Sequence, residues 1–169
     1  MKRTPQGTAV GVDDPYKHVD RCDHLTDSGE CRLSLVRVAN SPWLDDAERD
    51  DETACLVGPE GCWSECPQFR STATATACRR CGLEEHRVAH QSACRPLLEA
   101  HHLSYADADT SNSHEITVML CRWCHAKVHS GWARITDSVN PDPEAIAERE
   151  RRRGAELAEA EFVTAADRQ

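Results

Sequence analysis

The sequence predicts a small α+β metalloprotein, and three observations lead to this prediction. Only 39% of the 169 residues are hydrophobic and 5% aromatic, so the chain is too poor in apolar surface for one large core. Its ten cysteines exceed ordinary usage, and small domains with thin cores are commonly held together by metals or disulfides. Strand-like and helix-like patterns both occur in the second half of the chain.

Composition and charge exclude several classes of protein. No apolar run approaches the roughly 20 residues of a membrane span, and the first residues lack the apolar stretch of a signal peptide. We therefore expect a cytoplasmic protein without a membrane partner, in a reducing compartment where cysteines serve as metal ligands rather than disulfides. The net charge of −9 argues against non-specific binding to nucleic acid. Residues 78–139 are the exception, since they have no net charge and hold seven of the nine histidines.

The first half of the chain is expected to contain three segments. Residues 1–14 are polar and charged, and are expected to be disordered. Residues 15–70 hold five cysteines among turn signals and are expected to form a Cys-rich metal module. Residues 71–77 contain only Ser, Thr and Ala, which is typical of a linker.

The second half is expected to contain an α+β zinc domain over residues 78–135. Residues 97–103 and 115–120 are predicted to be strands, the second because of its β-branched side chains. Residues 122–131 contain no helix breaker before the final glycine and are predicted to form a short helix.

A charged helix is expected over residues 140–165. Asp142 can cap its first turn, Pro143 suits the first helical position, and Glu144 complements the helix dipole. The arginine run at residues 151–153 is interpreted as a solvated face paired with nearby glutamates, rather than as a phosphate contact.

Two C-x-x-C pairs predict a structural zinc site. Cys78 and Cys81 form the first pair, with Gly82 permitting the tight turn behind it, and Cys121 and Cys124 form the second. Each pair can cover one side of a tetrahedral ion, so together they form a closed, non-catalytic shell. Disulfides or a redox pair are the alternatives, but no thioredoxin-like pattern surrounds either pair.

Four histidines form a second candidate site. His125 and His129 are spaced to lie on one face of the predicted helix, where two imidazoles can bind one metal. His101 and His102 are adjacent in the preceding predicted strand and would point to opposite faces unless the strand bends there. A third imidazole from this strand would leave coordination positions open for phosphate and water.

The N-terminal cysteines predict a second zinc site less firmly, because their spacing matches no standard zinc finger. The preferred ligands are Cys22, Cys31, Cys55 and Cys66. Cys62 or His24 can replace one of these four ligands, and an iron–sulfur cluster or a segment of reduced cysteines is the alternative to zinc.

Three motifs together resemble the HNH nuclease family, in its zinc-stabilised form. They are CRRC at 78–81, LEAHHLSY at 98–105 and LCRWCHAKVH at 120–129, and the resemblance covers about a third of the chain. The chain as a whole also resembles small proteins of halophilic archaea. The HNH resemblance implies a treble-clef-like Cys₄ zinc knuckle joined to a ββα-metal core, and DNA cleavage with one divalent cation such as Mg²⁺ or Mn²⁺.

The resemblance also implies roles for the four histidines. His101, His125 and His129 would bind the catalytic cation, and His102 would be the general base that activates a water. The sequence departs from the family at Ile116, where Asn, sometimes Asp or His, is usual nine residues before the first helix histidine.

This departure keeps two functions open. Glu115, His114 or Asn112 can replace the missing polar side chain, which keeps a DNA endonuclease as the leading hypothesis. A catalytically degenerate zinc module, acting as a nucleic-acid or protein adaptor, is the alternative. In both cases, four cations around the zinc knuckle are the candidates for phosphate contacts: Arg79, Arg80, Arg122 and Lys127.

Overall fold

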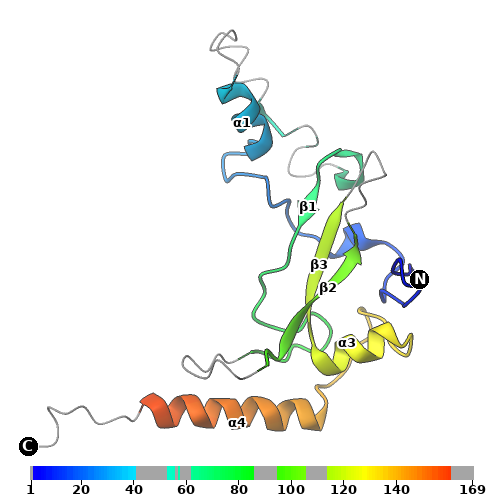
Figure 1. The fold of residues 1–169 in the computed structure, drawn as a ribbon, viewed down its shortest axis with the longest axis vertical. Helices are drawn as coiled ribbons and strands as arrows, with labels where there is room; N and C mark the ends of the chain where they lie inside the picture. The colour runs from blue at the N-terminus through cyan, green and yellow to red at the C-terminus, as the bar shows by residue number, and fades with distance from the viewer. Residues whose placement is uncertain are drawn as a thin grey trace, which may run out of the picture.

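The protein is a small α+β structure, seen here in a computed structural model (Figure 1). The structure describes residues 2–40, 53–55, 57, 62–85, 95–105 and 114–160. Within these residues the helical elements are η1 (Pro15–His18), α1 (Arg32–Ala39), η2 (Trp63–Glu65), α3 (Arg122–His129) and α4 (Pro143–Ala160). The strands are β1 (Arg70–Ser71), β2 (Leu98–Ser104) and β3 (Glu115–Cys121).

The three strands form one sheet in the order β1-β3-β2. β2 pairs antiparallel with β3, with His101 opposite Val118 and His102 opposite Thr117, whereas the short β1 pairs parallel with the start of β3. An irregularity in the pairing follows His102, where Ser104 is the next residue of β2 to pair with β3. Both predicted strands of the second half are therefore confirmed, while His101 and His102 themselves keep the regular register of the strand.

α3 follows β3 without a connecting loop, which fixes the direction of the helix. Cys121 ends β3 and also caps α3, because its sulfur accepts a hydrogen bond from the backbone N–H of Cys124. The helix ends at His129, and Gly131 then adopts a φ of 78°, a conformation that favours glycine after a helix. The helix predicted over residues 122–131 is confirmed to within two residues.

The core lies between the sheet, α3 and the N-terminal segment. Ile116 and Leu120 of β3 and Val128 of α3 are all fully buried. They pack with apolar side chains from β2, from the chain after α3 and from the first residues of the chain: Leu98, Leu103, Ala133, Ile135, Val10 and Val12.

The N-terminal segment differs from the disorder expected for it. Residues 2–12 form a tight turn, in which Lys2 and Val10 hydrogen-bond through their backbones. Val10 is 1% exposed, and Gly11 accepts a backbone hydrogen bond from Ile135. The segment is ordered because its few apolar residues cover an apolar surface of α3, which the sequence alone did not reveal.

The segment expected to be a linker, residues 71–77, also has ordered partners. The backbone N–H of Thr72 donates to the carboxylate of Asp23, and that of Ala73 donates to the Thr117 hydroxyl of β3. Residues 71–77 are therefore hydrogen-bonded both to the Cys-rich module, through Asp23, and to β3, through Thr117.

α4 lies across the end of the molecule opposite α1 (Figure 1). Its start matches the prediction, since Pro143 is the first residue and the Asp142 carboxylate accepts from the backbone N–H of Glu144. The predicted end at residue 165 lies outside the described residues. Within the part of the chain that the structure describes, no helix has the length and hydropathy required to span a bilayer.

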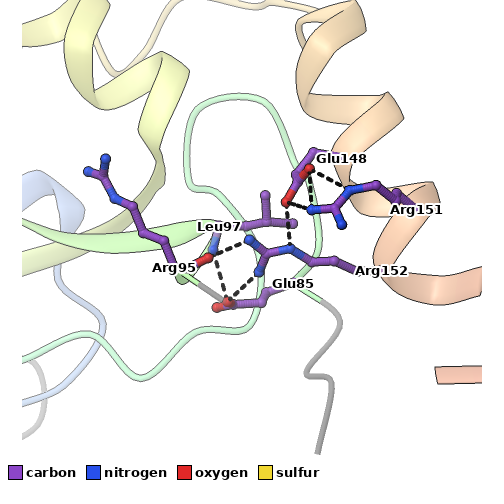
Figure 2. A network of polar contacts seen from close by, with 6 residues as sticks. All are labelled: Glu85, Arg95, Leu97, Glu148, Arg151 and Arg152. Atoms are coloured by element: carbon purple, nitrogen blue, oxygen red, sulfur yellow. Dashed lines mark hydrogen bonds and ion pairs between the residues drawn. The ribbon is translucent and has the colours of Figure 1, made fainter. Parts of the chain in front are cut away.

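Arg152 attaches α4 to the rest of the protein. Its side chain is 5% exposed, so the expectation of a fully solvated arginine run is wrong at this position. Figure 2 shows its guanidinium between Glu85 and Glu148, with a further hydrogen bond to the backbone carbonyl of Arg95. Arg151, by contrast, is exposed and pairs with Glu148 as expected.

Replacing Arg152 with alanine should loosen α4. The substitution leaves two largely buried carboxylates without their shared partner, so we expect the unfolding free energy to fall by about 2–4 kcal/mol. Arg153→Ala is the matched control, since Arg153 is exposed, and it should change stability by less than about 0.5 kcal/mol. Urea denaturation followed by circular dichroism measures both values. Equal effects of the two substitutions would contradict the attachment role.

Candidate metal centres

The first candidate centre is formed by the four cysteines of the two C-x-x-C pairs. Their sulfurs all lie within 4.8 Å of one another, and Cys81 and Cys121 are 3.7 Å apart. A tetrahedral ion with Zn–S bonds of about 2.3 Å requires sulfurs about 3.8 Å apart, so the spacing fits zinc. The set consists of Cys78, Cys81, Cys121 and Cys124, as predicted.

The backbone around these cysteines forms a knuckle. Gly82 has a φ of 70° and donates its N–H to the carbonyl of Cys78, which closes the tight turn expected there. Hydrogen bonds from the Cys121 and Cys124 thiols hold the pKa of Cys78 far below its ordinary value, while burial raises the pKa of Cys81 to about 12. The spacing of the four sulfurs shows that the thiols already converge on one point, where a cation can be held.

The second candidate centre consists of three histidines. His101 of β2 and both histidines of α3 place one ring nitrogen each within 4.8 Å of the other two. Nε2 of His125 and Nε2 of His129 are 2.9 Å apart. The i, i+4 spacing on α3 and the position of His101 on the adjoining strand therefore bring together the three residues predicted to bind one cation.

The protonation of His101 can be assigned from its partner. Nε2 lies 2.9 Å from the carbonyl oxygen of Val10, and because a carbonyl only accepts, Nε2 must carry the proton. Nδ1 is then an unprotonated acceptor in a fully buried ring, and it has no hydrogen-bond partner. Burial, together with the neighbouring histidines, lowers the pKa of His101 to about 4, which keeps the ring neutral as a metal ligand must be.

His125 is oriented by a carboxylate that the sequence analysis did not identify. Its Nδ1 donates to Glu99 over 2.7 Å, leaving Nε2 directed at His129. Burial alone would raise the pKa of Glu99, but hydrogen bonds from His125 and Arg95 lower it. In metal sites, a carboxylate that accepts from the far nitrogen of a histidine ligand commonly fixes the orientation of that ring. The sequence did contain a signal for this role of Glu99. Side chains two residues apart on a strand point to the same face, and Glu99 lies two residues before His101.

His102 has separate partners from the three-histidine cluster. Its Nε2 lies 3.5 Å from Oε1 of Glu115, and its ring stacks on Tyr105 with centroids 4.8 Å apart. Glu115 also accepts a 2.8 Å hydrogen bond from Arg70. This hydrogen bond and the charge of Arg70, together with His102, lower the pKa of Glu115 despite the opposing effect of burial.

The position at which HNH nucleases usually have asparagine contributes no polar group. Ile116 is fully buried in the core. Of the three replacements considered, Glu115 contacts His102, whereas His114 bonds to the Tyr16 hydroxyl and the Cys66 carbonyl. Asn112 lies outside the described residues.

The N-terminal cysteines are gathered in one region but are spaced more widely. Three of them, Cys31, Cys55 and Cys66, line one cavity of about 320 Å³. Burial raises the pKa of Cys66, and the charges of the other three thiols, including Cys22, raise it further. Among the described residues, the groups of three or more ligand atoms within 4.8 Å are the Cys78 cluster and the histidine cluster, so this set does not reach that spacing.

The four predicted phosphate contacts differ in their surroundings. The Arg80 side chain is 8% exposed and bonds to the Arg134 carbonyl and the Cys124 sulfur, so little of it is accessible to a phosphate. Arg79 is exposed, Arg122 lies over the Trp123 ring, and Lys127 is half-exposed beside Asp142.

Comparison with known proteins identifies a family without a described activity. The model of DUF7097, a family of unknown function, matches residues 1–168. No curated protein matches the chain, and no solved structure matches it.

Gly11 should be essential for the placement of Val10 against His101. A Cβ at Gly11 would lie 2.7 Å from a methyl carbon of Val128, whereas a Cβ at Gly7 would meet nothing within 4 Å, although both glycines have positive φ. Gly7→Ala should therefore lower the free energy of unfolding only by the backbone strain, about 1–2 kcal/mol. Gly11→Ala should lower it clearly more, because the added methyl group also collides with Val128. Gly11→Ala should also weaken metal binding at the histidine cluster, measured by titration calorimetry. Equal losses in the two variants would contradict this role.

Buried His101 should make stability depend on pH. The unfolded chain protonates this ring near pH 6.5, but the folded protein does so only near pH 4. The stability that the neutral ring provides is therefore complete above about pH 6.5 and is lost as the pH falls toward about 4. Between pH 6.5 and 5.5, the wild type should lose about 1 kcal/mol more than His101→Gln does. Urea denaturation of the zinc-loaded proteins measures this difference, and parallel losses would refute it.

Proposed function

The chain belongs to the DUF7097 family, whose function is unknown, and we propose that it is a metal-dependent endonuclease of the HNH type that hydrolyses DNA phosphodiester bonds. One observation supports this proposal above the others: three imidazoles place ring nitrogens within 4.8 Å of one another, and the next residue along β2, His102, has its own carboxylate partner. A purely structural metal site requires no such adjacent acid–base pair.

The three histidines would hold the catalytic cation. The buried and partnerless Nδ1 of His101 fits this role, as does the close approach of the His125 and His129 nitrogens. Three neutral ligands leave coordination positions open, unlike the closed Cys₄ set. When bound, a divalent cation supplies positive charge to the scissile phosphate and to the leaving oxygen.

His102 would act as the general base. With its Nε2–H directed at Glu115, Nδ1 is left unprotonated and accepts a proton from the attacking water. The stacked Tyr105 ring limits rotation of the imidazole, and the Arg70 hydrogen bond limits movement of the carboxylate. Glu115 thus serves as a positioning residue, in place of the polar group that Ile116 cannot supply.

DNA is the proposed substrate because the site lies in the part of the chain without net charge. Residues 78–139 balance their acidic and basic groups, whereas the remainder carries the whole net charge of −9. Arg79 and Arg122 carry cationic groups near the zinc knuckle, and Arg70 and Arg95 lie beside Glu115 and Glu99. Arg70 and Arg95 were not among the sequence-based candidates.

Cleavage of supercoiled plasmid tests the proposal. Purified protein is incubated with Mg²⁺, Mn²⁺ or Ni²⁺, at low and high salt, and without an added cation. We expect metal-dependent nicking that His102→Ala slows by about 100-fold or more. Glu115→Gln should slow it by about tenfold without changing metal binding at the histidine cluster. Val36→Ala is the control, because Val36 is exposed on α1 outside the proposed site, and this variant should retain full activity.

Two outcomes would contradict the proposal. Nicking that persists in His102→Ala would show that His102 is not the base. A folded, zinc-loaded protein that cuts nothing under any condition would instead favour the adaptor, with Ile116 as the mark of a degenerate site.

A further inference from the structure

We propose that Cys22, Cys31, Cys55 and Cys66 bind a second zinc ion, which holds the N-terminal Cys-rich module together. This inference is independent of the proposed nuclease activity. It rests on where the backbone places the four thiols and on what surrounds them.

The backbone pairing places two of these cysteines on one face. Glu30 pairs antiparallel with Ala54, while Cys31 donates its N–H to Thr53 and Cys55 donates its N–H to Gly29. Successive side chains of an extended segment point to opposite faces, so the residues next to Glu30 and Ala54 all point to the face that these two do not occupy. Cys31 and Cys55 are therefore diagonal neighbours on one face of this two-stranded ribbon. Their Cβ atoms are then separated by about 7 Å or less. Gly29, opposite Cys55, has no side chain to fill the space between them.

The third and fourth thiols approach the same region from separate turns. Cys66 directly follows η2, where its N–H donates to the carbonyl of Trp63, and it lines the cavity that Cys31 and Cys55 also line. Cys22 is 6% exposed and begins a turn closed by a hydrogen bond from Leu25. Leu25 in turn pairs with Cys31, which connects this turn to the ribbon.

The module has little else to stabilise it. Between residues 20 and 69, the buried apolar side chains among the described residues are Cys22, Leu25, Val38 and Phe69. So small a core cannot offset the entropy of ordering several segments, and a metal bound by all four would supply the missing stability. Thiolates from four separate segments suit a single tetrahedral ion, and zinc is the common ion for such a set.

Binding zinc would draw the four sulfurs together. They do not reach the 4.8 Å spacing of the Cys78 cluster, although three of them face one cavity. Cysteine side chains can rotate about their Cα–Cβ bonds, and three of these thiols already line one cavity toward which they can turn.

Cys62 provides a matched control within the same module. It is exposed, its sulfur lies 2.8 Å from the Ser64 hydroxyl, and it does not line the cavity. A serine at this position should leave metal binding unchanged.

The test counts metal-bound thiolates in the full chain. Protein reconstituted with Co²⁺ absorbs through thiolate-to-cobalt charge transfer, to which the histidine cluster does not contribute. The wild type should show about twice the intensity expected for one Cys₄ site, and Cys55→Ser/Cys66→Ser about half that of the wild type. Cys62→Ser should equal the wild type. Zinc content by mass spectrometry should fall by one ion per chain in the double variant only.

Three results would overturn the proposal. The first is a wild-type intensity equal to that of one Cys₄ site, which requires no variant to fold. The second is an equal loss in Cys62→Ser. The third is bound iron with its own visible absorbance in the purified protein, which would replace zinc with an iron–sulfur cluster. None of these results depends on nuclease activity, so the two proposals can fail separately.

Discussion

The convergence of four sulfurs at the junction of β3 and α3 is the constraint on which the rest of the structure depends. Cys121 is at once the last residue of β3, the cap of α3 and a member of the Cys₄ set. Cys78 and Cys81 bring a distant knuckle to the same point, and the N–H of Arg79 bonds to the Met119 carbonyl of β3. A metal at this junction would therefore fix the angle between strand and helix. That angle determines whether the histidines of α3 face His101 on β2.

The two candidate centres illustrate different uses of similar building blocks. The Cys₄ set has four ligands that saturate a tetrahedral ion and leave no room for chemistry. The histidine set offers three ligands, one fewer than a closed tetrahedral site requires. In the proposed function, the Cys₄ centre would hold β3 and α3 rigidly in place, and the histidine centre would depend on that fixed geometry to bind the catalytic cation.

The sequence predicted the local features well because they depend on short-range rules. The C-x-x-C pairs, the i, i+4 histidines and the cap at Asp142 each follow from spacing within a few residues. What it could not predict depended on distant partners. The burial of Arg152 needs Glu85, the order of residues 2–12 needs the surface of α3, and the role of Glu99 needs His125. Each of these depends on tertiary contacts that no local pattern encodes.

The hydrogen bond between Val10 and His101 spans 91 residues of sequence, and it has a consequence for how the protein matures. Contacts of such long range form late, since the intervening chain must first be brought into place. During synthesis the N-terminal turn leaves the ribosome well before β2 and α3. Until those elements emerge, its apolar residues lack the surface against which they pack in the finished protein. The histidine cluster can therefore be completed only after α3 has emerged and folded. A partly made chain would carry the zinc knuckle's first half but no competent histidine site.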